Sequence, residues 1–255
     1  MLIDTHTHLF LDAFDSDIEE VINSAIGNNV EKFFLPNIDS STIERLLNIS
    51  KKYPNNCYPL IGLHPTSVKE NYKQEIDTIE YWLTKEKFYA IGEIGIDLYW
   101  DKTFEHQQED AFKIQIEIAK KHSLPIIIHA RESFNEIFSI IDQLNDEKLT
   151  GIFHSFTGNK EQAEKIINYG GFKIGINGIV TFKNSELANI VKQIGIEHIL
   201  LETDSPYLAP HPKRGRRNES SFLIYTAKKI AELYNISIDE LADVTTENAK
   251  QIFKF

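Results

Sequence analysis

The chain has 255 residues, of which 42% are hydrophobic and 25% are charged, with 12 glycines and 8 prolines. This composition is that of a globular protein and excludes collagen-like, low-complexity and disordered chains. Acidic residues outnumber basic residues by 38 to 27, and the resulting net charge of −11 argues against a protein that coats nucleic acid through a broad basic face.

Cysteine content and hydropathy indicate the compartment. The single cysteine, Cys57, cannot form an internal disulfide, which fits a reducing environment. No apolar run approaches the ~20 residues of a membrane span. The initial residues MLIDTHTH lack the charged and apolar regions of a signal peptide. We therefore expect a soluble cytoplasmic protein without a membrane partner.

Short apolar segments alternate with longer segments of helical periodicity along the chain. We predict eight strands, at residues 2–6, 32–36, 58–63, 89–94, 125–129, 150–154, 172–176 and 198–202. The clearest predicted helix runs from 104 to 122, where Ala111, Ile114, Ile118 and Ala119 recur at spacings of three and four. Two further helices are expected at about 220–235 and 238–253, after the last strand.

Serine followed three positions later by glutamate is typical of a capping box at the start of a helix. The chain contains three such pairs at positions where a helix is expected to begin. They are Ser16 with Glu19, Ser41 with Glu44, and Ser237 with Glu240. Each pair predicts a helix N-terminus.

Eight strands alternating with helices predict a parallel sheet with helical crossovers. The number eight favours a (β/α)8 TIM barrel, regular or distorted, with an extra C-terminal helix. An open Rossmann-type sheet is the alternative, but no GxGxxG follows the first strand. Because no linker is long enough to divide the chain, we expect one domain over residues 1–255.

Five of the nine histidines fall where predicted strands end, which is where barrels of this kind carry their chemistry. His6 and His8 end the first strand, and their side chains point to the same face because they are two residues apart. His64 follows the third strand, while His129 and His154 end the fifth and sixth. The alternative for the last two is a hydrogen-bonded core histidine.

Two carboxylates occupy similar positions. Glu93 ends the fourth predicted strand in AIGEIGID, and Asp204 follows the eighth in ILLETDSPYL. Buried acids are usually paired or bound to metal, so a structural salt bridge is the alternative. Together with four histidines, the two acids can hold two divalent cations, one acid bridging them as in two-metal hydrolases. Imidazole and carboxylate without thiolate suit Zn, Mn or Mg.

A basic loop follows the eighth predicted strand, within APHPKRGRRNES. Its cations are Lys213, Arg214, Arg216 and Arg217. The loops after strands seven and eight are the usual phosphate corner of a barrel, so the loop suggests an anionic substrate, with a solvated loop as the alternative. Arg131 is a second candidate phosphate clamp because its guanidinium is a planar bidentate donor, although a structural salt bridge explains it equally well.

At this point the chain resembles the TatD family of metal-dependent deoxyribonucleases, within the amidohydrolase-like barrels, over essentially its whole length. The matching motifs are DTHTHL at 4–9, IGLHP at 61–65, GEIGID at 92–97, PIIIHAR at 125–131, HSFTG at 154–158 and ETDSPYLAP at 202–210. The resemblance implies six metal ligands, namely His6, His8, Glu93, His129, His154 and Asp204. It also implies that His64 contacts a substrate phosphate. Related barrels bridge their metals with a carboxylated lysine on strand four, where this chain has Glu93.

The predicted reaction is hydrolysis of a phosphodiester bond in DNA by water activated at two divalent cations. Asp204 would orient the water and accept its proton, and His64, Arg131 and the basic loop would hold the phosphate backbone. A metal-dependent amide or ester hydrolase, such as a deacylase of misacylated tRNA, is the main alternative, because the same Lewis acid chemistry serves carbonyl groups. A barrel with structural metals and a partner-binding surface is another. No obligate protein partner is predicted.

Overall fold

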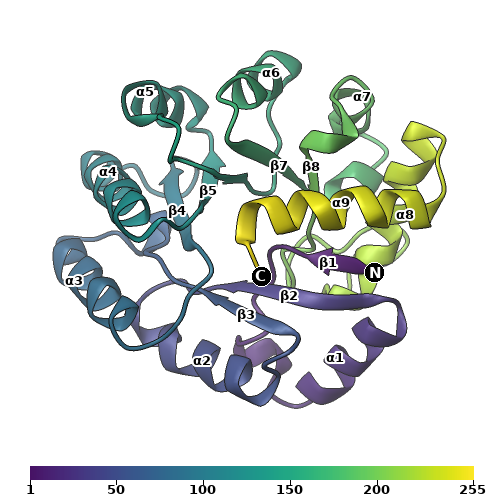
Figure 1. The fold of residues 1–255 in the computed structure, drawn as a ribbon, viewed down its shortest axis with the longest axis horizontal. Helices are drawn as coiled ribbons and strands as arrows, with labels where there is room; N and C mark the ends of the chain where they lie inside the picture. Colours follow the sequence, from purple (N-terminus) through teal and green to yellow (C-terminus); the bar gives the residue numbers. More distant parts are fainter.

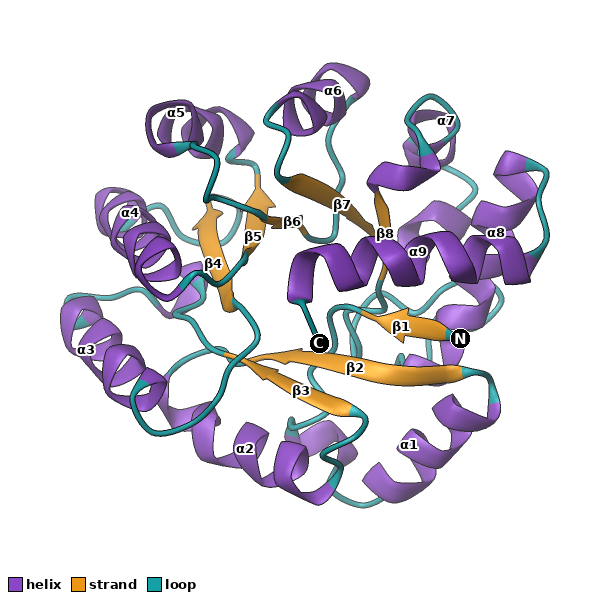
Figure 2. Cartoon of the chain, in the orientation of Figure 1, coloured by secondary structure: helices purple, strands orange, loops and turns teal.

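A computed structural model describes residues 1–255 as eight strands, each followed by a helix, with one additional helix at the end (Figure 1). The strands are β1 (Leu2–Asp4), β2 (Val30–Pro36), β3 (Cys57–Leu60), β4 (Ile91–Asp97), β5 (Ile126–Arg131), β6 (Gly151–Phe153), β7 (Phe172–Ile176) and β8 (Ile199–Leu201). The helices are α1 (Ile18–Gly27), α2 (Ile43–Lys52), α3 (Tyr72–Leu83), α4 (Glu105–His122), α5 (Phe134–Leu144), α6 (Lys160–Asn168), α7 (Leu187–Val191), α8 (Leu223–Tyr234) and α9 (Ile238–Phe253). Figure 2 shows the helices arranged around the strands.

The strands form a closed parallel arrangement. Two sheets, β1–β2–β3 and β4–β5–β6–β7–β8, contain all the regular pairings, and every pairing is parallel. Parallel bridges join the sheets at both seams, pairing Ile61 with Ile91 and Thr7 with Ser205. The predicted (β/α)8 barrel is thus confirmed. Its strands are short, and a single bridge joins the two sheets at each seam.

Helix α9 covers the amino-terminal end of the barrel and crosses the centre of the view in Figure 1. The Thr246 hydroxyl donates to the carbonyl oxygen of Met1 at 3.0 Å, so the helix packs where the strands begin. The Phe253 ring stacks on Phe34 of β2 with ring centroids 3.7 Å apart. The apolar cluster inside this end also contains Ile3, Tyr58, Leu60, Ala90, Ile127, Ile152, Leu200, Ala249 and Ile252. The carboxyl end of the strands is left for polar side chains.

The predicted strands and helices coincide with the observed ones to within a few residues. One difference bears on the site, because β4 continues to Asp97 and Glu93 lies inside the strand rather than at its end. The reciprocal cap of Ser237 and Glu240 at the start of α9 is confirmed. No helix combines the length and the apolar character needed to cross a membrane.

The two other predicted caps are wrong. Helix α1 begins after Asp17, and no side chain caps it. The chain enters α2 through a short 3₁₀ turn, which is capped by Asp39 instead of Ser41. The Asp39 carboxylate accepts a hydrogen bond from the backbone N–H of Ser41 at 3.0 Å. A carboxylate two residues earlier therefore replaces the predicted serine cap.

Candidate metal centre

All six predicted ligands converge at the mouth of the barrel, although they come from five different strands or the residues that follow them. His6 and His8 follow β1, Glu93 lies in β4, and His129 lies in β5. His154 and Asp204 follow β6 and β8. The parallel strand order places these carboxyl ends side by side. Side chains alternate between the two faces along the extended residues after β1, so His6 and His8 both point inward.

Glu93 lies at the centre of this cluster, and its two carboxylate oxygens face different histidines. Oε2 is 3.0 Å from His6 Nε2 and 3.8 Å from His8 Nε2. Oε1 is 2.6 Å from His129 Nδ1 and 2.6 Å from His154 Nε2. A carboxylate that presents one oxygen to each of two nitrogen sets has the geometry of a bridging ligand.

Asp204 completes the first set of ligands. Its Oδ1 lies 3.4 Å from His8 Nε2 and 3.9 Å from His6 Nε2. The backbone holds Asp204 in the left-handed region at φ 57, and its N–H donates to the His6 carbonyl at 2.9 Å. Its side chain is 14% exposed, whereas that of Glu93 is 3% exposed. Of the two acids, Asp204 is therefore the one more accessible to solvent.

His64 approaches the second set of ligands in an orientation different from theirs. Its Nε2 is 3.3 Å from Glu93 Oε1, and its Nδ1 accepts a hydrogen bond from the backbone N–H of Thr66 at 3.1 Å. Since Nδ1 accepts, the ring proton is on Nε2, which then donates instead of ligating. This orientation agrees with the phosphate contact implied by the resemblance.

The donors fit a divalent cation. The buried atom His6 Nε2, which faces Glu93, has no hydrogen-bond partner, even though a buried unsatisfied polar atom costs about 1–3 kcal/mol. One group of possible ligand atoms within 4.8 Å of one another comes from His6, His8 and Glu93. Another comes from His64, Glu93 and His129, and of these Glu93 and His129 are the ligands, because His64 Nε2 carries the ring proton. Imidazole and carboxylate are the donors that Zn and Mn accept.

The acids and histidines of the centre shift one another's pKa values toward their charged forms, with His6 as an exception. Burial alone would raise the pKa of Glu93, but His154, His64 and His6 hold that pKa well below its usual range. Burial alone would lower the pKa of His154, whereas Glu93 and Glu202 raise it well above its usual value. Burial lowers the pKa of His6, so its ring nitrogen stays neutral and able to ligate. The cluster is thus an ionised carboxylate between a His6 ring that favours its neutral form and a His154 ring that favours its charged form.

Two acids that the sequence analysis did not single out contact the histidine ligands from behind. Asp97 Oδ2 is 2.9 Å from His129 Nε2, which leaves Nδ1 of that ring facing Glu93. Glu202 is fully buried, and one of its oxygens is 3.7 Å from His154 Nδ1. Carboxylates placed in this way fix the ring orientation and tautomer of metal-binding histidines. Both acids interrupt apolar runs, which is the signal that identified Glu93.

Two glycines leave space for the histidines and for the acids behind them. A Cβ atom on Gly95 of β4 would lie 2.1 Å from the His129 carbonyl oxygen, and the residue has a φ of +139. A Cβ atom on Gly175 of β7 would lie 2.3 Å from Glu202 Oε2. Both distances are shorter than any contact between a carbon and an oxygen that are not bonded to each other. The strands can therefore carry only glycine at these positions without displacing Glu202 and the backbone of His129.

The predicted phosphate-binding cations lie around the mouth of the barrel. They differ in whether an acidic side chain pairs with them. Arg131 is exposed and forms no ion pair, and its guanidinium carbon is 3.9 Å from the centroid of the Tyr99 ring. Arg217 is held by Asp17 through two hydrogen bonds of 2.9 and 2.6 Å, so its charge is already compensated. This pairing joins the basic loop to the start of α1.

The remaining cations of the basic loop have no acidic partner. Lys213 lies over the Phe222 ring at 5.1 Å, and Arg214 lies over the Phe182 ring at 4.0 Å. Arg216 is exposed. Buried Asn218 anchors the end of the loop by donating to the carbonyl oxygens of Thr203 and Tyr207 at 2.9 and 2.6 Å. The loop therefore stands beside Asp204 with three uncompensated positive charges.

Comparison with known proteins identifies the family. The family model described as "TatD related DNase" matches residues 3–254. The chain belongs to this TatD family. It is 40% identical to the metal-dependent hydrolase YabD of Bacillus subtilis over 255 residues, covering 100% of this chain and 99% of that protein. It is 31% identical to the metal-dependent hydrolase YcfH of Escherichia coli K12, covering 99% of this chain and 95% of YcfH.

The solved structures agree with this assignment. The TatD homologue YjjV from Escherichia coli K12 superposes with a TM-score of 0.93 at 26% identity, covering 100% of this chain and 98% of YjjV. An amidohydrolase from Saccharomyces cerevisiae shares the fold, with a TM-score of 0.86 at 19% identity, covering 99% of each chain. The chain is therefore a metal-dependent hydrolase of the TatD family.

Proposed function

We propose that this TatD-family protein hydrolyses phosphodiester bonds in DNA with two divalent cations, Mg, Mn or Zn. The observation that carries the proposal is the placement of Glu93, whose two oxygens each face a separate group of imidazole nitrogens. His6, His8 and Asp204 would hold one ion, and His129 and His154 would hold the other, with Glu93 shared between them. Six ligands exceed the four that one tetrahedral site requires.

Asp204 and Glu93 have different roles in the proposed reaction. Divalent cations, when bound, neutralise phosphate charge and lower the pKa of water. Asp204, the more exposed acid, orients the attacking water and accepts its proton. Burial would raise the pKa of Asp204, but the hydrogen bond from His8 and the neighbouring histidine charges lower it, so the carboxylate is ionised at neutral pH. Glu93 is enclosed and would be shared between the two ions.

The hydrogen-bond donors and uncompensated cations around the mouth support a phosphate substrate. His64 offers its Nε2–H, Arg131 offers a guanidinium without an ionic partner, and the basic loop adds Lys213, Arg214 and Arg216. These groups stand out in a chain whose net charge is −11. Contacts of this kind recognise the backbone and not the base sequence, so we propose low sequence specificity. The description of the matching family model, which names a DNase, points the same way.

The experiment is a time course on end-labelled single-stranded DNA, with and without a chelator, beside an acylated tRNA. We expect cleavage of DNA that stops with the chelator and returns with Mn²⁺ or Mg²⁺. Glu93→Gln should abolish it, whereas Glu117→Gln, on the exposed surface of α4, should not. Deacylation of the tRNA by a protein that leaves DNA intact would overturn the proposal in favour of an ester hydrolase.

A further inference from the structure

Exposed aromatic side chains are concentrated at the mouth of the barrel. Tyr99 and Trp100, in the loop after β4, are 50% and 69% exposed, and Tyr207 after β8 is 53% exposed. The only other large hydrophobic residues with comparable exposure are Ile26 and Tyr81, on helices α1 and α3. Tyr207 lies beside the metal centre, with its ring 6.2 Å from His8. Tyr99 and Trp100 form a separate group whose exposure the metal centre does not explain.

The loop that carries these two rings is tied to the metal centre. Asp97 Oδ1 accepts hydrogen bonds from the backbone N–H groups of Tyr99 and Trp100 at 3.0 and 3.3 Å. The other oxygen of the same carboxylate contacts His129 at 2.9 Å. Gln108 of α4 accepts from the Asp97 N–H at 2.8 Å. The backbone of Trp100 is thus held at a fixed distance from His129 before any substrate arrives, which lowers the entropy lost on binding.

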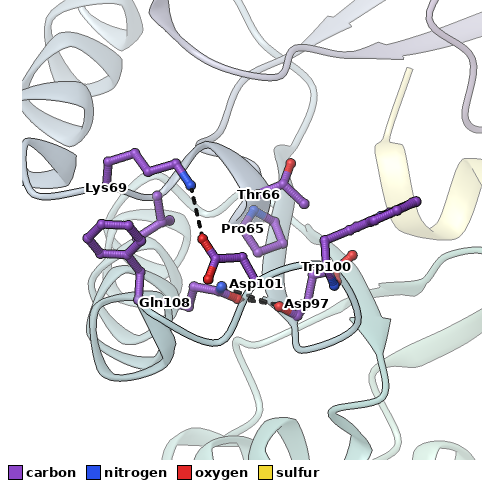
Figure 3. Close-up of a pocket in the computed structure, with 9 residues that line it drawn as sticks. Pro65, Thr66, Lys69, Asp97, Trp100, Asp101 and Gln108 are labelled. Carbon is purple, nitrogen blue, oxygen red and sulfur yellow. Dashed lines mark hydrogen bonds and ion pairs between the residues drawn. The ribbon is translucent and has the colours of Figure 1, made fainter.

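The indole of Trp100 faces outward from this loop. A cavity of about 130 Å³ separates the loop from the segment after β3, which contributes Pro65 and Thr66 (Figure 3). Lys69 Nζ and Asp101 Oδ2 approach each other to 3.8 Å in this cavity. Figure 3 shows the Trp100 ring extending away from that ion pair. Because Trp100 is 69% exposed, most of its aromatic surface is open to a planar ligand.

Arg131 adds a cation to the two rings. Its guanidinium carbon is 3.9 Å from the centroid of the Tyr99 ring and 5.2 Å from that of Trp100. The two rings stand perpendicular, with an interplanar angle of 87° and centroids 4.8 Å apart. A guanidinium stacked on an aromatic face keeps the N–H groups at its edge available for a phosphate oxygen. We call Tyr99, Trp100 and Arg131 the rim stack.

We propose that the rim stack is a nucleobase subsite of this enzyme. An unpaired base of the substrate stacks on the indole of Trp100, while Arg131, oriented by Tyr99, binds the phosphate next to that base. Stacking on an aromatic ring tolerates any base, because every base has a π face. The proposal rests on the proposed phosphodiesterase function and adds the part of the substrate that the metal centre does not contact.

Two substrates of equal charge test the subsite, namely a thymidine hexanucleotide and a hexamer of abasic tetrahydrofuran units with the same phosphates. Trp100→Ala should lower kcat/KM on the thymidine hexanucleotide by about 5- to 150-fold, because one base–aromatic stack is worth about 1–3 kcal/mol in affinity. It should change kcat/KM on the abasic hexamer by less than about twofold, since only phosphate contacts remain. Trp100→Phe should retain most of the activity.

The control variant is Tyr81→Ala, which removes a ring that is 56% exposed from α3 and should leave both rates unchanged. If Trp100→Ala lowers both rates equally or neither rate, the subsite is refuted, while the hydrolysis of DNA by the wild type still stands.

A binding measurement makes the outcome independent of hydrolysis. The chain has two tryptophans, so Trp82→Phe leaves Trp100 as the only indole fluorophore. Its fluorescence should be quenched in a saturable way by the thymidine hexanucleotide and not by the abasic hexamer. Saturable quenching without cleavage would support the subsite and overturn the nuclease proposal. Absence of quenching at concentrations that saturate hydrolysis would overturn the subsite.

Discussion

The contact between Asp97 and His129 allows a sharp test of how the second ligand set is oriented. In Asp97→Asn, the amide oxygen has to replace Oδ1, because that atom accepts two backbone N–H groups from Tyr99 and Trp100. The amide –NH₂ then takes the place of Oδ2, 2.9 Å from His129 Nε2. A donor at this position favours the tautomer in which Nε2 accepts and the ring proton moves to Nδ1.

That tautomer is the wrong one for metal binding. Nδ1 of His129 faces Glu93 Oε1 at 2.6 Å and is the atom available to the second ion. A proton on Nδ1 occupies the lone pair that would ligate. Loss of a carboxylate behind a histidine ligand typically lowers metal affinity or activity by 10–100-fold, which corresponds to about 1.4–2.7 kcal/mol. The same range is expected for removing a hydrogen bond to a charged group.

The assay is titration of the metal-free protein with Mn²⁺, measured by calorimetry, with kcat determined at each Mn²⁺ concentration. We expect Asp97→Asn to weaken one of two binding events by about 10–100-fold and to leave the other near its wild-type value. Asp101→Asn is the matched control, because it makes the same change in the same loop on an exposed carboxylate. Two binding events of wild-type affinity in Asp97→Asn would refute the orienting role.

Three further outcomes follow from the structure. Elemental analysis at saturating metal should find two ions in the wild type and at least one fewer in Glu93→Gln; a single ion in the wild type would refute the two-metal arrangement. Asp204→Asn should lower kcat by about 10²–10⁴-fold while DNA affinity changes little, and a near-normal rate would show that Asp204 is only a supporting ligand. Burial raises the pKa of Asp4 from 3.8 to about 7, so the folded protein binds this proton more tightly than the unfolded chain and loses stability as pH rises through that window. Relative to wild type, metal-free Asp4→Asn should gain about 2–3 kcal/mol of unfolding free energy between pH 5 and pH 8, as measured by urea titration. A difference in unfolding free energy between the two proteins that does not change with pH would contradict this.

The strand pattern and the strand-end histidines could be predicted from sequence because they depend on local information. Apolar runs identify strands, and the spacing of two between His6 and His8 alone places both rings on one face. The acids were found for a similar reason, since a charge such as Glu93 inside an apolar run requires a partner. In a barrel of parallel strands, these local signals suffice to bring the ligands to one end.

The remaining features depend on contacts between distant parts of the chain. Arg217 is paired with Asp17, 200 positions away, and nothing in the basic loop distinguishes it from Arg216. Which oxygen of Glu93 faces which histidine is set by the register between β4 and its neighbours. The predicted caps at Ser16 and Ser41 are wrong because α1 begins after Asp17 without a side-chain cap, and Asp39 caps the turn that leads into α2.

The position of α9 has a consequence for how this molecule folds. The apolar cluster at the amino-terminal end joins Ile3 of the first strand to Phe253 of the last helix, so it unites the two ends of the described chain. Contacts with such long sequence separation form late, because the entropy of closing the loop must be overcome first. Until α9 docks, the barrel interior is open to water on one side. We expect a chain cut before Ile238 to lose cooperative unfolding, even though every residue of the metal centre is still present.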